Sequence, residues 1–536
     1  MAGDQAENIT EPKHRTSSRR YIIWAMILVL AIVVFIGGMS VYVISDKSTQ
    51  YLRNFTASLE LIGLLYPESY NTGRLTTMAR KAVFEQLDRY SGYLEPEELQ
   101  RVTEDFTGSY GGIGITVVPH GKGLMIMSVR EDGPAGQAGI RTGDVILKAD
   151  SIALEKMSTY KATFLLRGEE GTVVDVLIAR NHFRDTLEYN LRRQTFKLIH
   201  IPFAGITEHG NLYIRILDFE AGLTADLLDV LDSLYLENPD SVTGVIIDLR
   251  GNPGGLLGEA VAASDLFLDK GHVIAGVSGR SRWQAREYRS SGRDVLNGLP
   301  LAVLISRGSA SAAEIMAGAL KYAGRAFLVG DTTFGKGLIQ EFRSLFDGSG
   351  IRLTTARYYF EGGIFINDPG LPEIDEAVGI PPDYYIELIE DEAFPVELES
   401  SLLMRDFAVD NRDEILAYSP FTEASPVWLD SFFSYADQKG FRFESGFTEL
   451  ARFVRDEIVY RNYSDETFAA IDRICRLSEE DDKTQPEKHR DYIKKRLYQI
   501  ALEVGFGYAE SYRAVVLPYR RDIVLAEKLL QSEVTN

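Results

Sequence analysis

This chain has almost no cysteine, no clustered histidines and no excess of positive charge. The 536 residues include one cysteine, Cys475, so the chain can form no internal disulfide and no cysteine-based metal site. The seven histidines are scattered without an HxxxH pair, so a zinc protease has no support. The net charge is −21, whereas nucleic-acid phosphates require clustered Lys and Arg. We therefore expect no metal, no cofactor and no nucleic-acid partner.

One long stretch lacks charge altogether. It runs from Tyr21 to Ile44 and follows a polar segment, residues 1–20, that carries Lys and Arg next to it. About 20 apolar residues span a bilayer core, and a basic flank normally stays in the cytoplasm. No clear signal-peptidase site follows. We expect a cytoplasmic tail at 1–20 and a retained single-pass helix at 21–44 in the cell (inner) membrane, with everything after Ser45 on the extracytoplasmic (periplasmic) side.

The remainder is long enough for several domains and has a globular composition, 45% hydrophobic and 25% charged. Residues 50–106 show helical spacing of apolar residues and predict an N-terminal helical region. Residues 195–390 alternate buried-strand runs with helical spacing, which is typical of an α/β layer structure. From 391 to 536 the pattern is helical again, with aromatic residues and acidic runs. For that segment we expect packing or subunit contacts and find no chemistry.

Residues 107–193 consist of short β-rich runs broken by glycines, and this segment resembles a PDZ domain. Such domains add a C-terminal peptide tail to a sheet edge, and glycines before a strand leave N–H groups free to meet its carboxylate. A small β domain without a ligand is the alternative. Arg167, near the exit of the segment, is equally well explained as a coupling residue or as a surface arginine. The predicted peptide-binding residues are Gly111, Gly112, Ile113, Gly114, Ile115 and Arg167.

Ser311 begins a predicted helix, and taken alone it fits a capping box with Glu314. Its neighbours favour chemistry. A helix N-terminus supplies free N–H groups, and the glycine turn from Arg250 to Gly255 follows a buried strand, so its backbone can approach a carbonyl. Lys336 lies between two glycines in an apolar setting. A buried lysine can be neutral and can act as a base, although most lysines are solvated.

These motifs together resemble the carboxyl-terminal processing, or tail-specific, proteases, and with the PDZ segment the resemblance covers roughly residues 50–390. The matching runs are Ile247 to Gly255, Ser309 to Ile315, Thr333 to Gly337 with Gln340, and Gly379 to Asp383. The resemblance implies a core related to the crotonase and caseinolytic-protease folds. It implies Ser311 as nucleophile, Lys336 as general base and Gln340 as the residue that orients the lysine. It also implies an oxyanion hole formed by backbone N–H groups of Ala312, Gly254 and Gly255.

Three positions depart from the family pattern. Ala313 stands where serine is usual, Arg89 replaces a proline, and Phe360 to Gly363 replaces Thr-Pro-Ser-Gly. The sequence thus predicts a membrane-anchored serine endopeptidase acting on protein or peptide substrates with free C-termini. A homo-oligomer or an adaptor protein is left open. The alternatives are a silent PDZ scaffold, which should have lost Ser311 or Lys336, and a crotonase-type acyl-transfer enzyme, which needs neither a PDZ module nor a Ser/Lys pair.

Overall fold

The computed structural model describes residues 47–535 except 107, 131, 156, 158, 181–184, 237–238, 240–241, 281–284, 293, 367–378, 388–391, 422–425 and 462. It divides into two compact units, one ending at Arg80 and one running from Lys81. The first contains α2 (Lys47–Leu65) and most of α3 (Thr72–Phe84). The predicted anchor at 21–44 lies outside the described residues. Among those that are described, no helix has the length and apolar character needed to cross a membrane.

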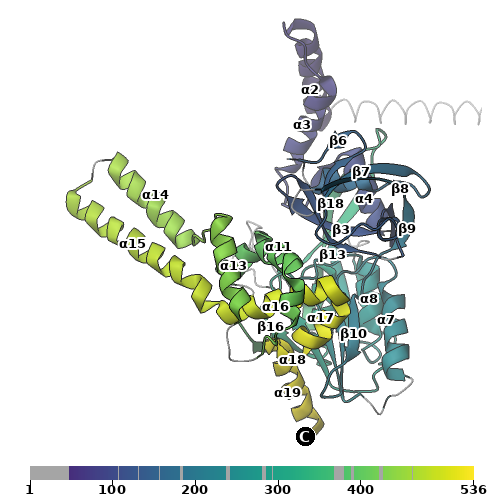
Figure 1. Cartoon of the computed structure of the whole chain (residues 1–536). Helices are drawn as coiled ribbons and strands as arrows, with labels where there is room; N and C mark the ends of the chain where they lie inside the picture. Colours follow the sequence, from purple (N-terminus) through teal and green to yellow (C-terminus); the bar gives the residue numbers. More distant parts are fainter. Residues whose placement is uncertain are drawn as a thin grey trace, which may run out of the picture. The chain divides into compact units, whose positions relative to one another are not determined.

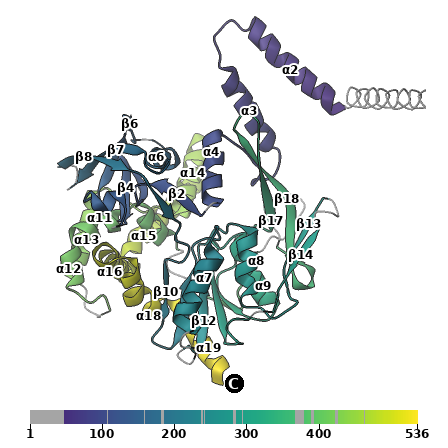
Figure 2. The ribbon, with the colours of Figure 1, turned by 90° about the vertical axis from the view of Figure 1, so that its right-hand side faces the viewer.

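The PDZ segment forms an antiparallel sheet in the order β3-β4-β5-β7-β8 (Figure 1). Helix α6 (Thr159–Leu166) packs against it (Figure 2). A two-stranded ribbon, β2 (Ser109–Gly112) with β9 (Gln194–Lys197), joins the points where the chain enters and leaves this domain. The strands of the sheet are β3 (Ile115–His120), β4 (Gly123–Val129), β5 (Val145–Ala149), β7 (Val173–Arg180) and β8 (Asp185–Arg192).

The α/β part is built on a six-stranded sheet in the order β10-β11-β12-β15-β16-β20, parallel from β11 onwards. Its central strand β12 is an unbroken apolar run ending in an aspartate, because both faces of the sheet are covered. Val245 and Ile247 face one core, and Ile246 faces the other. The strands are β10 (Phe203–Ile206), β11 (Asn211–Arg215), β12 (Gly244–Asp248), β15 (Leu301–Ile305), β16 (Phe327–Gly330) and β20 (Tyr384–Tyr385).

Helices α7 (Leu223–Leu231), α8 (Leu257–Asp265) and α9 (Ala312–Tyr322) cover the first face of this sheet (Figure 2). The opposite face is covered by the C-terminal helices, ending in α19 (Arg521–Thr535), whose Ile523 and Leu530 pack against the sheet. The C-terminal region is therefore helical, as predicted, and its packing role includes one face of the α/β core.

A second sheet, in the order β1-β18-β13-β14 with β17 and β19 also on β18, flanks the first. Only β18 was predicted as a strand, and the other five lie where the sequence pattern predicted none, because short runs interrupted by glycine or charge carry weak periodicity. Strand β1 lies within residues 50–106, the region predicted to be helical, and pairs with β18. The strands are β1 (Gly92–Leu94), β13 (Val273–Gly279), β14 (Arg286–Arg289), β17 (Leu338–Ser344), β18 (Gly350–Phe360) and β19 (Ile364–Phe365).

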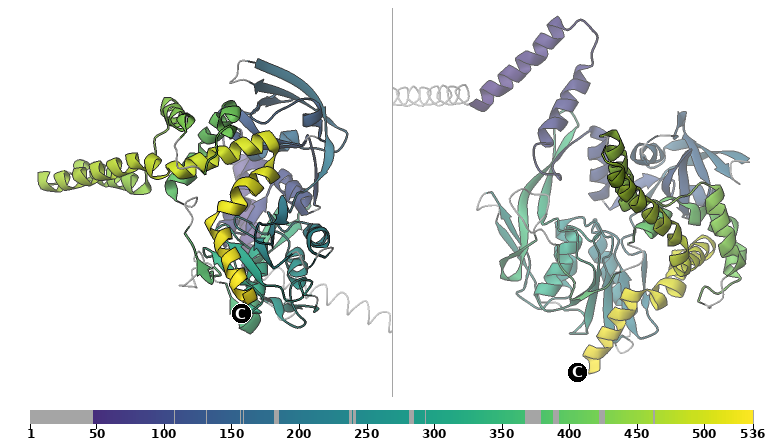
Figure 3. Two further views of the ribbon diagram at one scale, coloured as in Figure 1. Left: turned by 60° about the horizontal axis from the view of Figure 1, so that its bottom comes forward. Right: turned by 90° about the vertical axis from the view of Figure 1, so that its left-hand side faces the viewer.

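The region after residue 391 has its own aromatic core around Trp428 and Phe432. Helices α14 (Gly446–Tyr460) and α15 (Asp465–Lys488) run side by side as a hairpin (Figure 3). The charged stretch from Cys475 to His489 thus continues a helix. One helix of this region, α11 (Leu403–Asp410), also contacts the PDZ sheet, where Arg405 Nη1 donates to the Met127 carbonyl at 3.3 Å.

Candidate active site

Ser311 occupies the junction between the turn after β15 and the first residue of α9. Its backbone has φ 56° and ψ −114°, whereas a serine that only caps a helix is normally extended. A non-glycine residue in such a sparsely populated region costs about 1–3 kcal/mol and needs strong local support. The predicted capping box with Glu314 is present, but a strained backbone is not needed for capping and is typical of a nucleophile at a sharp strand-to-helix turn.

The neighbouring serines are structural. Ser309 is fully buried and donates to the Leu249 carbonyl at 2.7 Å, while its oxygen accepts from the Ser306 N–H at 2.9 Å. The Ser306 hydroxyl in turn accepts from the Gly251 N–H at 3.0 Å. These bonds fasten the nucleophile turn to the glycine turn of residues 250–255.

Gly254 brings the glycine turn into contact with Ser311. It has φ +100°, and a Cβ built on it would lie 2.7 Å from the Ser311 Cβ and 2.8 Å from the Ala312 nitrogen, so only glycine fits. The Gly254 N–H donates to Asn252 Oδ1 at 2.8 Å and is therefore engaged within the turn. Among described residues, Gly255 and Ala312 show no hydrogen bond from their N–H groups. The structure thus brings the three predicted oxyanion-hole residues together at Ser311, and only Gly254 has its N–H occupied.

Glu314, on the first turn of α9, is fully buried and accepts four hydrogen bonds. Its Oε2 accepts from the N–H groups of Ser311 at 2.8 Å and Lys336 at 3.0 Å. Its Oε1 accepts from the Thr333 hydroxyl at 2.7 Å and the Gly335 N–H at 2.7 Å. Burial raises the pKa of the Glu314 carboxyl, against the lowering effect of these four donors. One carboxylate therefore ties the serine to the lysine loop.

Lys336 lies in the loop between β16 and β17. Gly337 beside it has φ +52°, and a Cβ there would meet the Ile366 carbonyl oxygen at 2.2 Å. Burial lowers the pKa of the Lys336 amine, and the Arg352 guanidinium lowers it further, while Glu314 opposes the shift. The amine lies over the Tyr90 ring, 5.4 Å from its centroid. In the described part of the chain no hydrogen bond joins it to Ser311.

Gln340 lies on β17, and its amide donates to Thr354 Oγ1 at 3.3 Å. The Thr354 hydroxyl donates to Asp88 Oδ1 at 3.0 Å, and the Thr354 N–H donates to Ser91 Oγ at 3.0 Å. Gln340 is therefore connected to the Asp88–Ser91 segment in this structure, and its predicted role toward the lysine stays a prediction. In the same segment Arg89, at the position where the family has proline, lies over the rings of Tyr90 and Phe334.

A single cavity of about 570 Å³ joins these residues. Its lining includes Ser311, Ala312, Gly255, Lys336 and Gln340. Most of the remaining lining is apolar, with Leu99 and Val102 contributed by α4 (Pro96–Phe106) and others by α8, α9 and β17.

The predicted peptide-binding residues lie apart from this cavity's described lining. Gly111 and Gly112 belong to β2, and Ile115 begins β3. Gly111 packs so closely on Gly168 that a Cβ would lie 1.9 Å from the Gly168 carbonyl oxygen. The Arg167 guanidinium lies 4.8 Å from the centroid of the Tyr110 ring. Arg167 is thus placed beside the ribbon through which the chain enters and leaves the PDZ domain.

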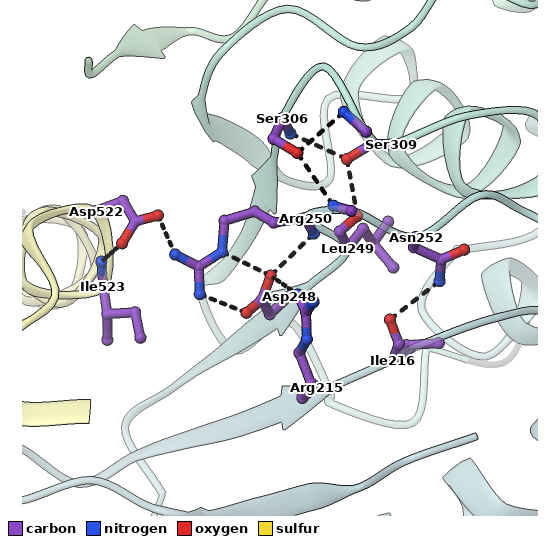
Figure 4. A network of polar contacts seen from close by, with 12 residues as sticks. Arg215, Ile216, Asp248, Leu249, Arg250, Asn252, Ser306, Ser309, Asp522 and Ile523 are labelled. Carbon is purple, nitrogen blue, oxygen red and sulfur yellow. Dashed lines mark hydrogen bonds and ion pairs between the residues drawn. The ribbon is translucent and has the colours of Figure 1, made fainter. Parts of the chain in front are cut away.

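A buried charge network supports the glycine turn from below (Figure 4). Asp248, at the end of β12, accepts from Arg250 Nε at 2.8 Å and from Arg215 Nη1 at 2.6 Å. Burial raises the pKa of the Asp248 carboxyl, but the two guanidinium groups outweigh it and hold that pKa well below its usual range. Arg250 also forms an ion pair with Asp522 of α19.

Sequence reasoning missed four of these features. Glu314 was recognised only as a capping partner, and the charges of Asp248 and Arg250 directly after a buried strand were a signal that could have been used. Tyr90 carries no motif of its own. Asp522 is 272 residues from Arg250 in the chain, so no local pattern could have paired them.

Comparisons with known proteins agree with this site. The profile described as peptidase family S41 matches residues 211–386, and the PDZ domain profile matches residues 111–191. The carboxy-terminal processing protease CtpA of Bacillus subtilis is 32% identical over 328 residues, 60% of this chain and 67% of that protein. The carboxy-terminal-processing protease of Bartonella bacilliformis is 29% identical over 371 residues, 69% of this chain and 83% of that protein.

A solved structure, the photosystem II D1 C-terminal processing protease, is 29% identical and covers 62% of this chain and 87% of its own, with a TM-score of 0.37. A score of this size adds no argument about the fold. The site and the matched segments define a serine-type peptidase with an attached PDZ domain. The chain belongs to peptidase family S41, the carboxy-terminal processing proteases. The predicted family and the predicted enzyme class are therefore confirmed.

Proposed function

We propose that this peptidase cleaves protein chains through an acyl-enzyme on Ser311, with Lys336 as the general base. The observation that carries the proposal is the shared cavity, in which a backbone-strained serine at a helix start lies with a lysine of lowered pKa. A serine needs a base, and a lysine can serve only when it is neutral. Glu314 supports the pairing because it bonds the backbones of both residues.

The reaction would proceed in two transfers. The neutral Lys336 amine takes the proton from the Ser311 hydroxyl as its oxygen attacks the substrate carbonyl carbon. The N–H groups of Ala312 and Gly255 stabilise the negative oxygen of the tetrahedral intermediate. The Lys336 ammonium then returns the proton to the leaving amine, which departs and leaves an ester on Ser311. The same lysine then takes a proton from water as the water oxygen attacks the ester carbonyl, and it returns that proton to the Ser311 oxygen as the acid product leaves.

The lysine must move for this chemistry. Its amine lies over Tyr90 and makes no hydrogen bond to Ser311 among the described residues. The lysine side chain has four rotatable bonds, so we propose that its amine turns toward Ser311 within the cavity that both residues and Gln340 line. We propose that Gln340 orients the amine in the productive position, as the family resemblance implies.

The test is cleavage of casein or of a tagged peptide by the full chain in detergent, compared with Ser311→Ala and Lys336→Ala. Both variants should lose at least about 1,000-fold in kcat/KM, because either loss removes the nucleophile or its activation. Lys439→Ala, whose amine lies over Tyr435 in the C-terminal region, is the matched lysine control and should be fully active. Undiminished cleavage by Ser311→Ala would end the proposal.

The PDZ domain is proposed to hold the C-terminal tail of the substrate along β3, with its carboxylate at residues 111–115. The proposal is supported by the PDZ match and by the position of this glycine-rich run directly before β3. Arg167 lies beside the same ribbon, and we propose that it transmits tail binding to the protease core.

Two peptides of one sequence, one with a free carboxylate and one amidated, test the tail proposal. The free acid should be cleaved with a KM at least about 10-fold lower, since charge-assisted hydrogen bonds to a terminal carboxylate are strong. Arg167→Ala should reduce this preference and leave cleavage of the amidated peptide unchanged. Equal KM values for the two peptides would contradict tail recognition.

We also propose that residues 21–44 anchor the enzyme in the inner membrane with residues after Ser45 on the periplasmic side. The support is the uncharged length of that stretch and the basic segment before it. The enzyme should stay with the membrane after alkaline carbonate washing. A protease added to the outer face of spheroplasts should degrade the PDZ domain. Release by carbonate, or protection of the PDZ domain in intact spheroplasts, would refute the anchor or its orientation respectively.

A further inference from the structure

The glycine turn of residues 250–255 is held by groups from four elements of the fold. Asn252 is fully buried, and its side-chain amide donates to the carbonyl of Ile216, the residue after β11, at 3.0 Å. The Ala310 N–H of the nucleophile turn donates to the Asn252 carbonyl at 2.9 Å. Asp248 of β12 holds Arg250 through its backbone N–H at 2.9 Å and through its guanidinium. The fourth element is α19, which contributes Asp522.

Helix α19 lies outside the segment matched by the peptidase family profile, which ends at residue 386. Asp522 stands in its first turn and is fully buried. One carboxylate oxygen accepts from the Ile523 N–H at 2.9 Å, and the N-terminal end of a helix favours a negative charge. Its other oxygen faces the Arg250 guanidinium (Figure 4). The Asp522 carboxylate is therefore held by its own helix as well as by the arginine.

The second carboxylate of this network comes only with α19. Arg215 and Arg250 carry two positive charges around the single carboxylate of Asp248, and Asp522 supplies a second negative charge, which it shares with Arg520 at 3.3 Å. A guanidinium without a full set of acceptors is costly in a buried setting and shifts toward other partners. Because Arg250 is the first residue of the glycine turn, any shift of its side chain acts directly on the backbone that leads to Gly254 and Gly255.

We infer that Asp522 is a positioning residue of the protease, through which the C-terminal helical region sets the oxyanion turn by way of Arg250. Asp522 touches neither substrate nor Ser311. This role rests on the proposed function of the turn as the oxyanion donor. It assigns to the C-terminal region a part in catalysis in addition to covering the sheet.

A positioning role and a merely structural role differ in what they change. Loss of a structural contact lowers the fraction of folded enzyme, whereas a misplaced oxyanion turn lowers the turnover of each folded molecule. Since an oxyanion exists only in the transition state and the intermediate, kcat should fall while KM stays constant. The decisive quantity is therefore kcat per folded molecule, with the folded fraction taken from the amplitude of the thermal unfolding transition.

The experiment compares Asp522→Asn with Glu527→Gln in the full chain, using an amidated peptide substrate. Glu527 is a second buried carboxylate of α19. Its partner is His209 at 3.1 Å, and His209 is not part of the glycine turn. Asp522→Asn should lower kcat per folded molecule by about 10- to 100-fold with KM within twofold, a range typical of a small misplacement. Glu527→Gln should keep kcat per folded molecule within twofold of the wild type.

Wild-type kcat per folded molecule in Asp522→Asn would overturn the inference while leaving the proposed function intact, since Ser311→Ala reports on that function separately. If Asp522→Asn yields no folded protein, Asp522→Glu decides, because it keeps the charge and displaces it by one methylene. Positioning then requires a fall of at least threefold in kcat per folded molecule. A wild-type value in Asp522→Glu would overturn the inference.

Discussion

The two segments that flank Ser311 are held in different ways. The glycine turn of residues 250–255 is fixed by buried side chains, ion pairs and glycine backbone that no other residue could copy. The lysine loop of residues 333–337 is fixed by its backbone, which donates to the single carboxylate of Glu314. The Lys336 side chain itself rests on an aromatic ring, a contact worth only about 0.5–2 kcal/mol.

The glycine turn is therefore a rigid part of the site, and the Lys336 side chain is an adjustable one. The proposed nucleophile and backbone donors are preorganised, an arrangement that stabilises an oxyanion at least reorganisation cost. The proposed base, Lys336, can leave its resting place for a small free energy. We expect changes on the turn side to alter catalysis strongly and permanently, and changes around the lysine to alter its ionisation or its position by smaller factors.

The largest effect should come from the turn. Gly254→Ala places a methyl group 2.7 Å from the Ser311 Cβ in a backbone region that disfavours side chains, so the turn must move away from the nucleophile. We expect kcat/KM for a peptide to fall by about 100- to 1,000-fold, comparable to losing an oxyanion donor. Gly258→Ala is the matched control: its Cβ meets nothing within 4 Å, and in α8 it should keep full activity and be slightly more stable.

Glu314 joins the two regions, and its replacement should break both at once. Glu314→Gln exchanges one acceptor oxygen for an amide that faces donors, so one of the two pairs of donors loses its acceptor. We expect kcat/KM to drop by about 100-fold. Thr333→Val, which removes only one of the four donors, should give a much smaller loss. Equal losses in the two variants would show that the carboxylate does not connect the regions.

The lysine side is sharpened by pH. The base acts when neutral, so kcat/KM should rise with pH through the pKa of Lys336, which is lowered from its usual value by burial and by Arg352. Arg352→Gln removes one cause of the lowering, so that pKa rises and the ascending limb moves to higher pH. Arg343→Gln, an exposed arginine paired with Glu341, should leave the limb in place. An unmoved limb in Arg352→Gln would mean that another group titrates.

The smallest effect concerns the resting place of the lysine. Tyr90→Ala removes the ring beneath the amine, and Tyr90→Phe keeps it. If about 0.5–1 kcal/mol holds the lysine away from the serine, Tyr90→Ala should raise kcat on an amidated peptide roughly two- to fivefold. Tyr90→Phe should match the wild type. A fall in kcat in Tyr90→Ala alone would instead make the ring part of the productive geometry.

Local motifs predicted the site where the chemistry depends on neighbours in sequence. Ser311 at a helix start, the glycines before it and the lysine between glycines lie within short runs, and the structure brings them to one cavity. The same reasoning underrated Glu314, because a capping box explains its spacing without the second pair of donors from residues 333 and 335. Those donors come from another loop and depend on tertiary packing.

Long-range features could not be read from the sequence. Asp522 pairs with Arg250 only because α19 packs on the face of the sheet opposite α9, and apolar periodicity in 523–530 indicates a helix without naming its partner. Strand β17 was likewise unassigned, since its alternation is short and its pairing with β18 contains a register shift at Ile339. In each case the deciding interaction joins segments that the local pattern treats as independent.

The place of Asp522 in the chain also sets an order of events during translation. Residues 244–311 leave the ribosome long before residues 521–535, so the sheet and the nucleophile turn can fold while Arg250 still lacks its second carboxylate. A nascent chain would then carry its serine and its lysine but an unsettled oxyanion turn. Full proteolytic activity would then follow the docking of α19, at the end of synthesis.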